Sequence, residues 1–102
     1  MAILKSTRES FKTEAIIAVP YFAATTQQQE YIDTTYKNTG KIVSQDTDLS
    51  IDGLSQTINT VWLNDAVLEE FNTDPIIIQY HADRASYNEQ QGIMSVVSVY
   101  YE

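Results

Sequence analysis

The residues best suited to chemistry lie close together in the last third of the chain. His81 is the only histidine among the 102 residues, with Tyr80 just before it and Arg84 three positions after it. An imidazole titrates near neutral pH, so His81 is a candidate general base or metal ligand. Positions i and i+3 share a helix face, so a helix here would set Arg84 beside His81. We therefore take His81 as the candidate catalytic residue, and Tyr80 and Arg84 as candidate ligand-binding residues. The guanidinium of Arg84 would either bind a carboxylate on a ligand or pair with an acidic side chain.

Three aromatic residues complete the predicted site. Trp62 and Phe71 are expected to pack in the core, and they are also candidates to line a pocket beside it. Tyr21, like Tyr100 and Tyr101, falls in a predicted strand, where it would contact either a ligand or a second subunit. The candidate ligand-binding residues are therefore Tyr21, Trp62, Phe71, Tyr80 and Arg84.

Several other kinds of site are not expected. The chain has no cysteine, which excludes disulfides, thiolate metal ligands and a cysteine nucleophile. Asp46, Asp48 and Asp52 lack the ligand order and the terminal glutamate of an EF-hand loop, so no metal site is predicted. No Ser-His-Asp order, glycine-rich phosphate loop or HExxH helix is present.

Charge and hydropathy restrict the partners and the compartment. The formal charge is −8, with fourteen acidic residues against six basic ones. Such a surface repels phosphate backbones and anionic membranes, so neither nucleic acid nor a membrane is an expected partner. The first twelve residues lack the apolar core of a signal peptide, and no run approaches a membrane span. A cytoplasmic protein is expected.

The elements that must position these residues follow strand and helix patterns in turn. Runs rich in β-branched and aromatic residues predict strands at residues 15–22, 41–51, 54–63 and 93–101. Asp52-Gly53 predicts a type I′ hairpin turn between the second and third strands. Residues 1–13 fit a short strand, an arm on a partner subunit, or a frayed terminus.

Capping signals predict the helices. Thr25 and Thr26 are each followed three residues later by glutamine, which favours a helix over residues 27–38. Asn64 or Asp65 caps a second helix that runs through Phe71. The Asp74-Pro75 pair then starts a helical stretch over residues 75–88, which either continues the second helix after a kink or stands alone.

This order predicts a ferredoxin-like βαββαβ fold, in which both helices cover one face of an antiparallel sheet. Residues 1–102 fit a single α+β domain of this kind. The other face of the sheet stays open, and the apolar residues 93–101 lie on its last strand. A second copy of the chain would cover that face most economically, so a homodimer is expected.

The chain resembles the dimeric α+β barrel superfamily, in particular its antibiotic-biosynthesis-monooxygenase-like group, over residues 15–101. The resemblance rests on Trp62 ending the third strand, the polar cap at Asn64-Asp65, Phe71 nine positions after the tryptophan, and the restart at Asp74-Pro75. It implies that two sheets from two subunits pack face to face into a barrel. It also implies a pocket in each subunit between the sheet and the helices.

Haem-degrading members of this group use an asparagine on the first strand, a tryptophan on the second main helix and a histidine ten residues later. Phe71 takes the place of that tryptophan and His81 that of the histidine, and the predicted first strand has no asparagine. The resemblance therefore implies no cofactor, with haem as the alternative. Other members oxidise aromatic substrates without a cofactor.

The leading hypothesis is a small homodimer that binds a small, largely apolar or aromatic ligand. If it is an enzyme, it resembles a monooxygenase or an isomerase without a cofactor. The alternative is a non-catalytic structural or interaction protein with the same fold, such as a viral or phage accessory protein.

Overall fold

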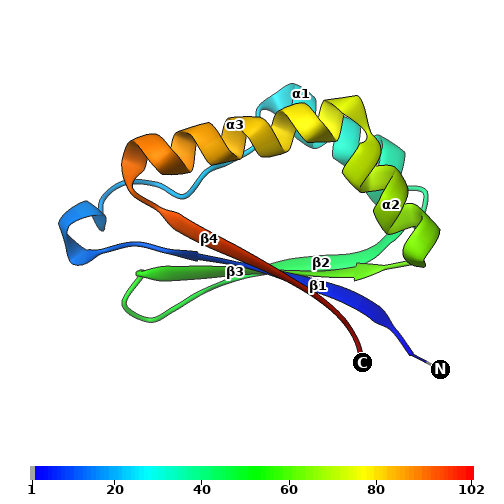
Figure 1. Ribbon diagram of the computed structural model, residues 1–102, viewed down its shortest axis with the longest axis horizontal. Coiled ribbons are helices and arrows are strands. Elements are labelled where there is room, and N and C mark those ends of the chain that lie inside the picture. Colours follow the sequence, from blue (N-terminus) through cyan, green and yellow to red (C-terminus); the bar gives the residue numbers. More distant parts are fainter. Residues whose placement is uncertain (1) are drawn as a thin grey trace.

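A four-stranded antiparallel sheet and a layer of helices on one of its faces make up the fold (Figure 1). The structure, a computed structural model, describes residues 2–102. The strands are β1 (Leu4–Phe11), β2 (Ile42–Leu49), β3 (Ser55–Trp62) and β4 (Met94–Tyr101). The helices are α1 (Thr26–Ile32), with a π-helical extension η2 (Asp33–Lys37), then α2 (Asp65–Thr73) and α3 (Pro75–Gln91).

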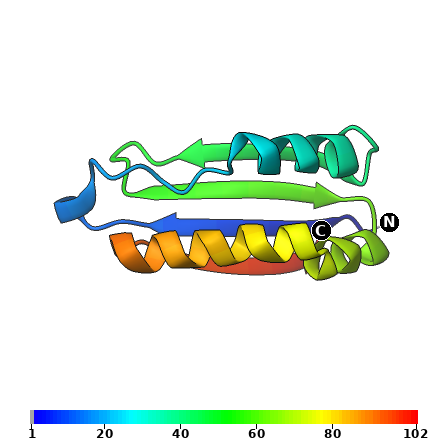
Figure 2. The same cartoon turned by 90° about the horizontal axis from the view of Figure 1, so that it is seen from above.

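The strands lie in the order β2-β3-β1-β4, and each neighbouring pair is antiparallel. Seen from above, α1 lies over β2 while α3 runs along β1 and β4 (Figure 2). This is the predicted ferredoxin-like α+β arrangement, with helices on one face of the sheet. Among residues 2–102, no helix combines the length and the apolar character that a membrane crossing needs.

The prediction of the first strand is wrong. The strand is Leu4–Phe11, and it lies inside the sheet between β3 and β4 rather than forming an arm or a frayed end. Residues 15–22 instead contain a 3-10 turn, η1 (Glu14–Ile16), and an irregular segment that leads to α1. No residue of 15–22 is fully buried, so apolar composition alone did not make this stretch a strand.

The predicted helix starts are confirmed. Thr25 and Gln28 form a reciprocal capping box, in which the Thr25 hydroxyl accepts from the Gln28 backbone N–H and the Gln28 side chain accepts from the Thr25 N–H. Asn64 caps α2 through the Val67 N–H. Asp74 has an extended backbone and caps α3 through the Ile76 N–H, so α3 stands alone instead of continuing α2. Gly92 ends α3 with a φ of 78°, a left-handed conformation that glycine adopts without strain.

The hairpin between β2 and β3 is confirmed, but its predicted turn type is wrong. A type I′ turn needs positive φ at both central residues, and only Gly53 has one, at 73°. The connection is a wider loop, closed by a hydrogen bond from the Ser50 N–H to the Ser55 carbonyl (3.0 Å). The Ser50 hydroxyl and the Leu54 N–H both donate to the Asp52 carboxylate, which lowers the pKa of Asp52. This side-chain turn replaces the backbone geometry expected from the sequence.

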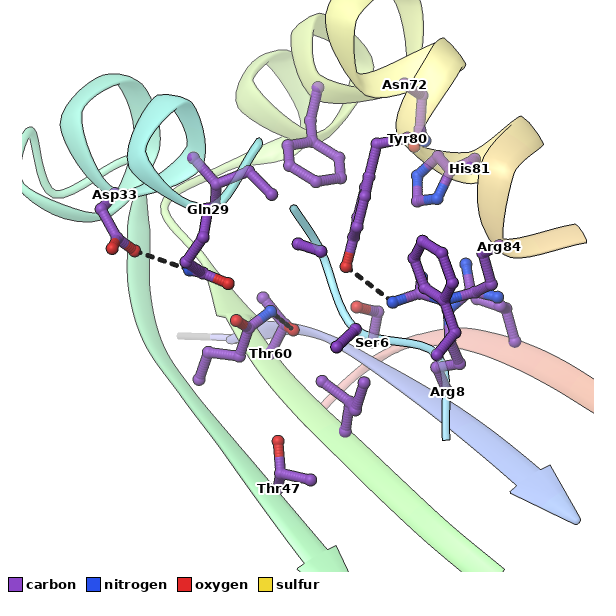
Figure 3. A pocket seen from close by; sticks show the side chains of 18 of the residues that line it. Ser6, Arg8, Gln29, Asp33, Thr47, Thr60, Asn72, Tyr80, His81 and Arg84 are labelled. Atoms are coloured by element: carbon purple, nitrogen blue, oxygen red, sulfur yellow. Dashed lines mark hydrogen bonds between the residues drawn. The ribbon is translucent and has the colours of Figure 1, made fainter. Parts of the chain in front are cut away.

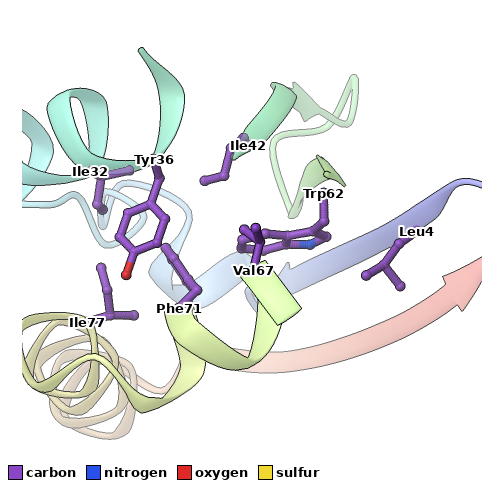
Figure 4. Close-up of a cluster of buried hydrophobic side chains, with 8 residues drawn as sticks. All are labelled: Leu4, Ile32, Tyr36, Ile42, Trp62, Val67, Phe71 and Ile77. Carbon is purple, nitrogen blue, oxygen red and sulfur yellow. The ribbon is translucent and has the colours of Figure 1, made fainter. Parts of the chain in front are cut away.

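The core lies at one end of the space between the layers (Figure 4). Phe71 is at its centre, with ring centroids 4.9 Å from Tyr36 and 4.8 Å from Trp62 in edge-to-face arrangements. The Tyr36 ring is fully buried and its hydroxyl donates to the Asp74 carboxylate (2.6 Å), as does that of Tyr31. The buried cluster is Leu4, Ile32, Tyr36, Ile42, Trp62, Val67, Phe71 and Ile77.

Candidate functional site

A cavity of about 730 Å³ lies between the sheet and the helices, next to the core (Figure 3). All four strands, α1, α2, α3 and residues 22–24 contribute to its walls. Ligand pockets in proteins typically measure about 300–1,000 Å³. The volume is therefore sufficient for a small organic molecule.

The sheet side of the cavity is mostly polar. Side chains alternate along a strand, and the helix-facing positions of β1 are Leu4, Ser6, Arg8 and Ser10. On the neighbouring strands, Gln45 donates to the Thr60 hydroxyl (2.9 Å), and the Trp62 indole N–H donates to the Ser6 hydroxyl (2.9 Å). These bonds hold polar side chains against the strands and leave the space above them open.

His81 lines this cavity from α3 and also an adjoining smaller hollow. Its ring packs against Phe71 and Tyr80, with centroids 5.8 Å and 5.4 Å away. Within residues 2–102, its Nδ1 atom is buried without a hydrogen-bond partner. Burial, reinforced by the positive charges of Arg8 and Arg84, lowers the pKa of His81 from 6.5 to about 4. The imidazole is therefore neutral at pH 7.

Arg84 and Tyr80 lie in the same cavity wall as His81. Arg84 is only 7% exposed, and its guanidinium lies beside the neighbouring rings of Phe22 and Tyr80, 5.3 Å and 4.8 Å from their centroids. Its Nη2 donates to the Tyr80 hydroxyl (2.6 Å). The arginine is thus held by aromatic rings and a hydroxyl in place of a carboxylate.

Arg8 is a site residue that the sequence analysis did not identify. It extends from β1 into both hollows, and its Nη1 donates to the Ser95 hydroxyl of β4 (3.3 Å). Burial and the nearby charge of Arg84 lower the pKa of Arg8 from 12.5 to about 10. The only sequence signal for it was the alternation of residues 4–11, which is weak because the inward residues are polar.

The remaining predicted site residues divide into two groups. Trp62 and Phe71 are buried core residues that also line the cavity, so they form the boundary between the core and the hollow. Tyr21 was predicted to lie on a strand over residues 15–22, but that stretch is irregular. Tyr21 is not among the residues that line the cavity. Its hydroxyl donates to the Gly53 carbonyl (2.9 Å), and Lys12 lies over its ring.

Metal binding has no structural basis in the described part of the chain. Nowhere among residues 2–102 do three or more histidine, cysteine, aspartate or glutamate side chains come together in a way that could hold an ion. The corrected first strand, Leu4–Phe11, also contains no asparagine, the residue that haem-degrading relatives were expected to have there.

Comparisons with known proteins establish the fold. No protein-family model and no curated protein sequence matches the chain. Among solved structures, a conserved protein of unknown function from Bacteroides thetaiotaomicron is similar, with a TM-score of 0.66 and 11% identity over 99% of this chain and 98% of that one. An antibiotic biosynthesis monooxygenase matches with a TM-score of 0.59 and 12% identity, over 95% of both chains.

A dimeric ferredoxin-like protein from an uncultured marine organism also matches, with a TM-score of 0.54 and 8% identity, over 100% of this chain and 96% of that one. The chain therefore has the fold of the antibiotic-biosynthesis-monooxygenase-like and dimeric ferredoxin-like proteins, and the predicted resemblance is confirmed at that level.

Proposed function

We propose that this protein binds a small, largely apolar molecule with an aromatic body in the cavity beside His81. The observation that carries the proposal is the cavity itself. The hollow is partly open to solvent, lies next to a tightly packed core, and has a volume of about 730 Å³ that falls within the usual range of ligand pockets. Phe22, Phe71 and Trp62 offer ring surfaces to an aromatic ligand, and polar side chains from the strands and helices line the rest of the same space.

His81 is the residue we propose for chemistry on the bound ligand. Its imidazole lines the cavity and is neutral at pH 7, so it can accept a proton or a hydrogen bond from a ligand that reaches its ring. If the protein is an enzyme, we propose oxygenation of the bound aromatic compound by molecular oxygen without a cofactor; one solved structure with the same fold is described as an antibiotic biosynthesis monooxygenase. In that role His81 would be a weak base in the empty protein, because its pKa of about 4 lies well below the working pH.

Haem is the cofactor that the fold resemblance would suggest, and the residues do not fit it. Of the three residues expected in haem-degrading relatives, only the histidine is present, since Phe71 replaces the tryptophan and β1 lacks the asparagine. We therefore propose a site without a cofactor and assign no step to haem.

We also propose that the protein works as a homodimer through the open face of the sheet. This face carries the outward side chains of β1 and β4, of which Phe11, Met94, Val96 and Tyr100 are apolar and exposed. One solved structure with the same fold is described as dimeric. Light scattering in solution is expected to give the mass of two 11.6 kDa chains, and a monomer mass would contradict this part of the proposal.

The test of ligand binding uses N-phenyl-1-naphthylamine, a neutral aromatic probe whose fluorescence rises when it enters an apolar site. We expect saturable binding to the wild-type protein. Val99→Trp should weaken binding roughly tenfold or more, because Val99 lines the cavity and an indole there occupies ligand space. Ile78→Trp is the matched control: Ile78 is 52% exposed, against 53% for Val99, and does not line the cavity.

The outcome also separates the two functional hypotheses. Binding that Val99→Trp weakens and Ile78→Trp leaves unchanged would support a ligand-binding protein. No saturable binding by the wild-type protein, or equal binding by both variants, would overturn the proposal and favour the non-catalytic interaction protein.

A further inference from the structure

The two arginines of this chain are its most unusual charged residues. Only six residues are basic, and two of them, Arg8 and Arg84, line the same two adjoining hollows. Three of the four lysines form ion pairs on the surface: Lys5 with Glu102, Lys37 with Asp33, and Lys41 with Glu70. Within residues 2–102, neither arginine pairs with a carboxylate, although fourteen acidic residues are present.

Both guanidinium groups have donors to spare. A guanidinium carries five N–H donors. In the described part of the chain, Arg84 uses one for the Tyr80 hydroxyl and Arg8 uses one for the Ser95 hydroxyl. These neutral partners fix the positions of the side chains without neutralising their charge. A planar guanidinium held in this way is well suited to bind a carboxylate or a sulfonate through two parallel hydrogen bonds.

The arrangement is electrostatically incomplete. Arg84 is buried, and burial together with Arg84 lowers the pKa of Arg8, so two cations share a partly desolvated site. The acidic residues nearest to this space are Glu30 and Asp33 on the wall of the cavity and Glu89 on the wall of the smaller hollow. None of them pairs with an arginine. Buried like charges without a counter-charge oppose folding, and an anion between them would remove that cost.

We propose that Arg8 and Arg84 together bind the anionic group of an aromatic carboxylate or sulfonate whose ring system occupies the apolar part of the cavity. The inference rests on the proposed function, since it names the class of ligand for the same cavity. The rings of the ligand would lie toward Trp62, Phe71 and Leu68, while its charged end lies between β1 and α3. His81 lines the cavity and the smaller hollow together with both arginines.

A pair of fluorescent probes tests this directly. The compounds 8-anilino-1-naphthalenesulfonate and N-phenyl-1-naphthylamine share their ring system, but only the first carries a sulfonate. We expect the wild-type protein to bind the sulfonate roughly tenfold or more tightly than the neutral probe, because charge-assisted hydrogen bonds contribute more than neutral ones. Arg8→Gln and Arg84→Gln should each bring the ratio of sulfonate affinity to neutral-probe affinity close to one.

Lys12→Gln provides the matched control at constant ionic strength. It removes the same positive charge from a residue that lines neither hollow, so it should leave both affinities unchanged. If the wild-type protein and the arginine variants bind both probes equally well, the anion site is overturned while the ligand-binding proposal stands. If the wild-type protein binds neither probe, both proposals fail. Arg8→Gln and Arg84→Gln act independently, so failure of one variant to fold leaves the other as the test.

A second measurement locates the anion. Because His81 is the only histidine, its imidazole resonances in a proton NMR spectrum are unambiguous. Burial is the main cause of the lowered pKa of His81, and the charges of Arg8 and Arg84 add to it. An anion between the arginines offsets those charges, so the pKa of His81 should be higher in the sulfonate complex than in the complex with the neutral probe. An unchanged His81 titration in the sulfonate complex would contradict the proposed position of the anion.

Discussion

The space between the helices and the sheet has a packed end and a hollow end, built by the same strands. At the packed end β1, β2 and β3 direct Leu4, Ile42 and Trp62 toward the helices, and Tyr36 and Phe71 close over them. Two or more residues further along, the same faces of the strands carry Ser6, Arg8, Gln45, Thr47 and Thr60. β1 and β3 keep one register and one alternation of side chains between the two ends, whereas β2 has a bulge between Ile42 and Ser44 that shifts its register against β3.

The difference shows how a small domain combines stability with a site. Large apolar side chains fill one end and supply the burial that stabilises the fold. At the other end the strands carry Ser6, Thr47 and Thr60 in place of large apolar side chains, and a cavity remains between the layers there. Trp62 and Phe71 belong to both regions, because one side of each packs in the core and another contacts the cavity.

The largest expected effect on stability comes from a substitution in the core at the packed end. Phe71→Ala should lower the free energy of unfolding by about 3–5 kcal/mol, because it removes the ring at the centre of the core and leaves a void. Urea unfolding followed by far-ultraviolet circular dichroism measures the change. Thr47→Ala, at an exposed position that faces the cavity, is the control and should change stability by less than about 0.5 kcal/mol. Equal losses in the two variants would contradict the division into two ends.

The pH dependence of the free energy of unfolding tests the hollow end separately from the packed end, because His81, which titrates in this range, lies at the hollow end. His81 has a pKa of about 4 in the folded protein and about 6.5 when unfolded, so the unfolded chain binds more protons between these values. Stability should therefore be complete above about pH 6.5 and fall as the pH drops toward 4, by on the order of 2 kcal/mol.

His81→Gln should remove this part of the pH dependence. The carboxylates with lowered pKa values, Asp52 and Asp74, do not interfere, because their contribution is lost only below their usual pKa of 3.8. Urea unfolding at several pH values between 4 and 7 measures the effect. A pH profile identical in the wild-type protein and the variant would show that His81 does not titrate as the structure implies.

The smallest expected effect concerns the charge at the hollow end. Arg8→Gln removes one of two like charges from a partly desolvated site and loses only the bond to Ser95. We expect the free energy of unfolding to stay within about 1 kcal/mol of the wild-type value, with the shift toward greater stability. Thermal unfolding in the absence of any anionic ligand measures it. A loss of several kcal/mol would mean that Arg8 supports the fold and is not reserved for a ligand.

Much of the architecture could be predicted from local sequence signals. The capping residues Thr25, Asn64 and Asp74 located three helix starts because each supplies a hydrogen-bond acceptor to N–H groups left free in the first turn. β3 and β4 were predicted within about one residue of their ends, from their β-branched and aromatic residues. The cluster of His81 and Arg84 also followed from helical spacing, which depends only on positions in one element.

The location of β1, the type of the hairpin turn and the role of Arg8 were decided by the tertiary structure. Strand prediction relies on apolar side chains facing a core, and the inward face of β1 after Leu4 lines a polar cavity instead. Residues 15–22 have the more apolar composition, but the sheet already contains a central strand that pairs on both sides along residues 4–11.

The sequence by itself therefore determined where the helices start and that His81 and Arg84 share a helix face, because those features depend on near neighbours in the chain. The ends of α2 and α3 lie two or three residues beyond the predicted ones. Only the tertiary structure decided that β1 carries polar side chains toward the helices. It also brought Arg8 to the same cavity as Arg84 and left both without a carboxylate partner. The physical reason is that a cavity, like a charge without its partner, is defined by residues far apart in sequence.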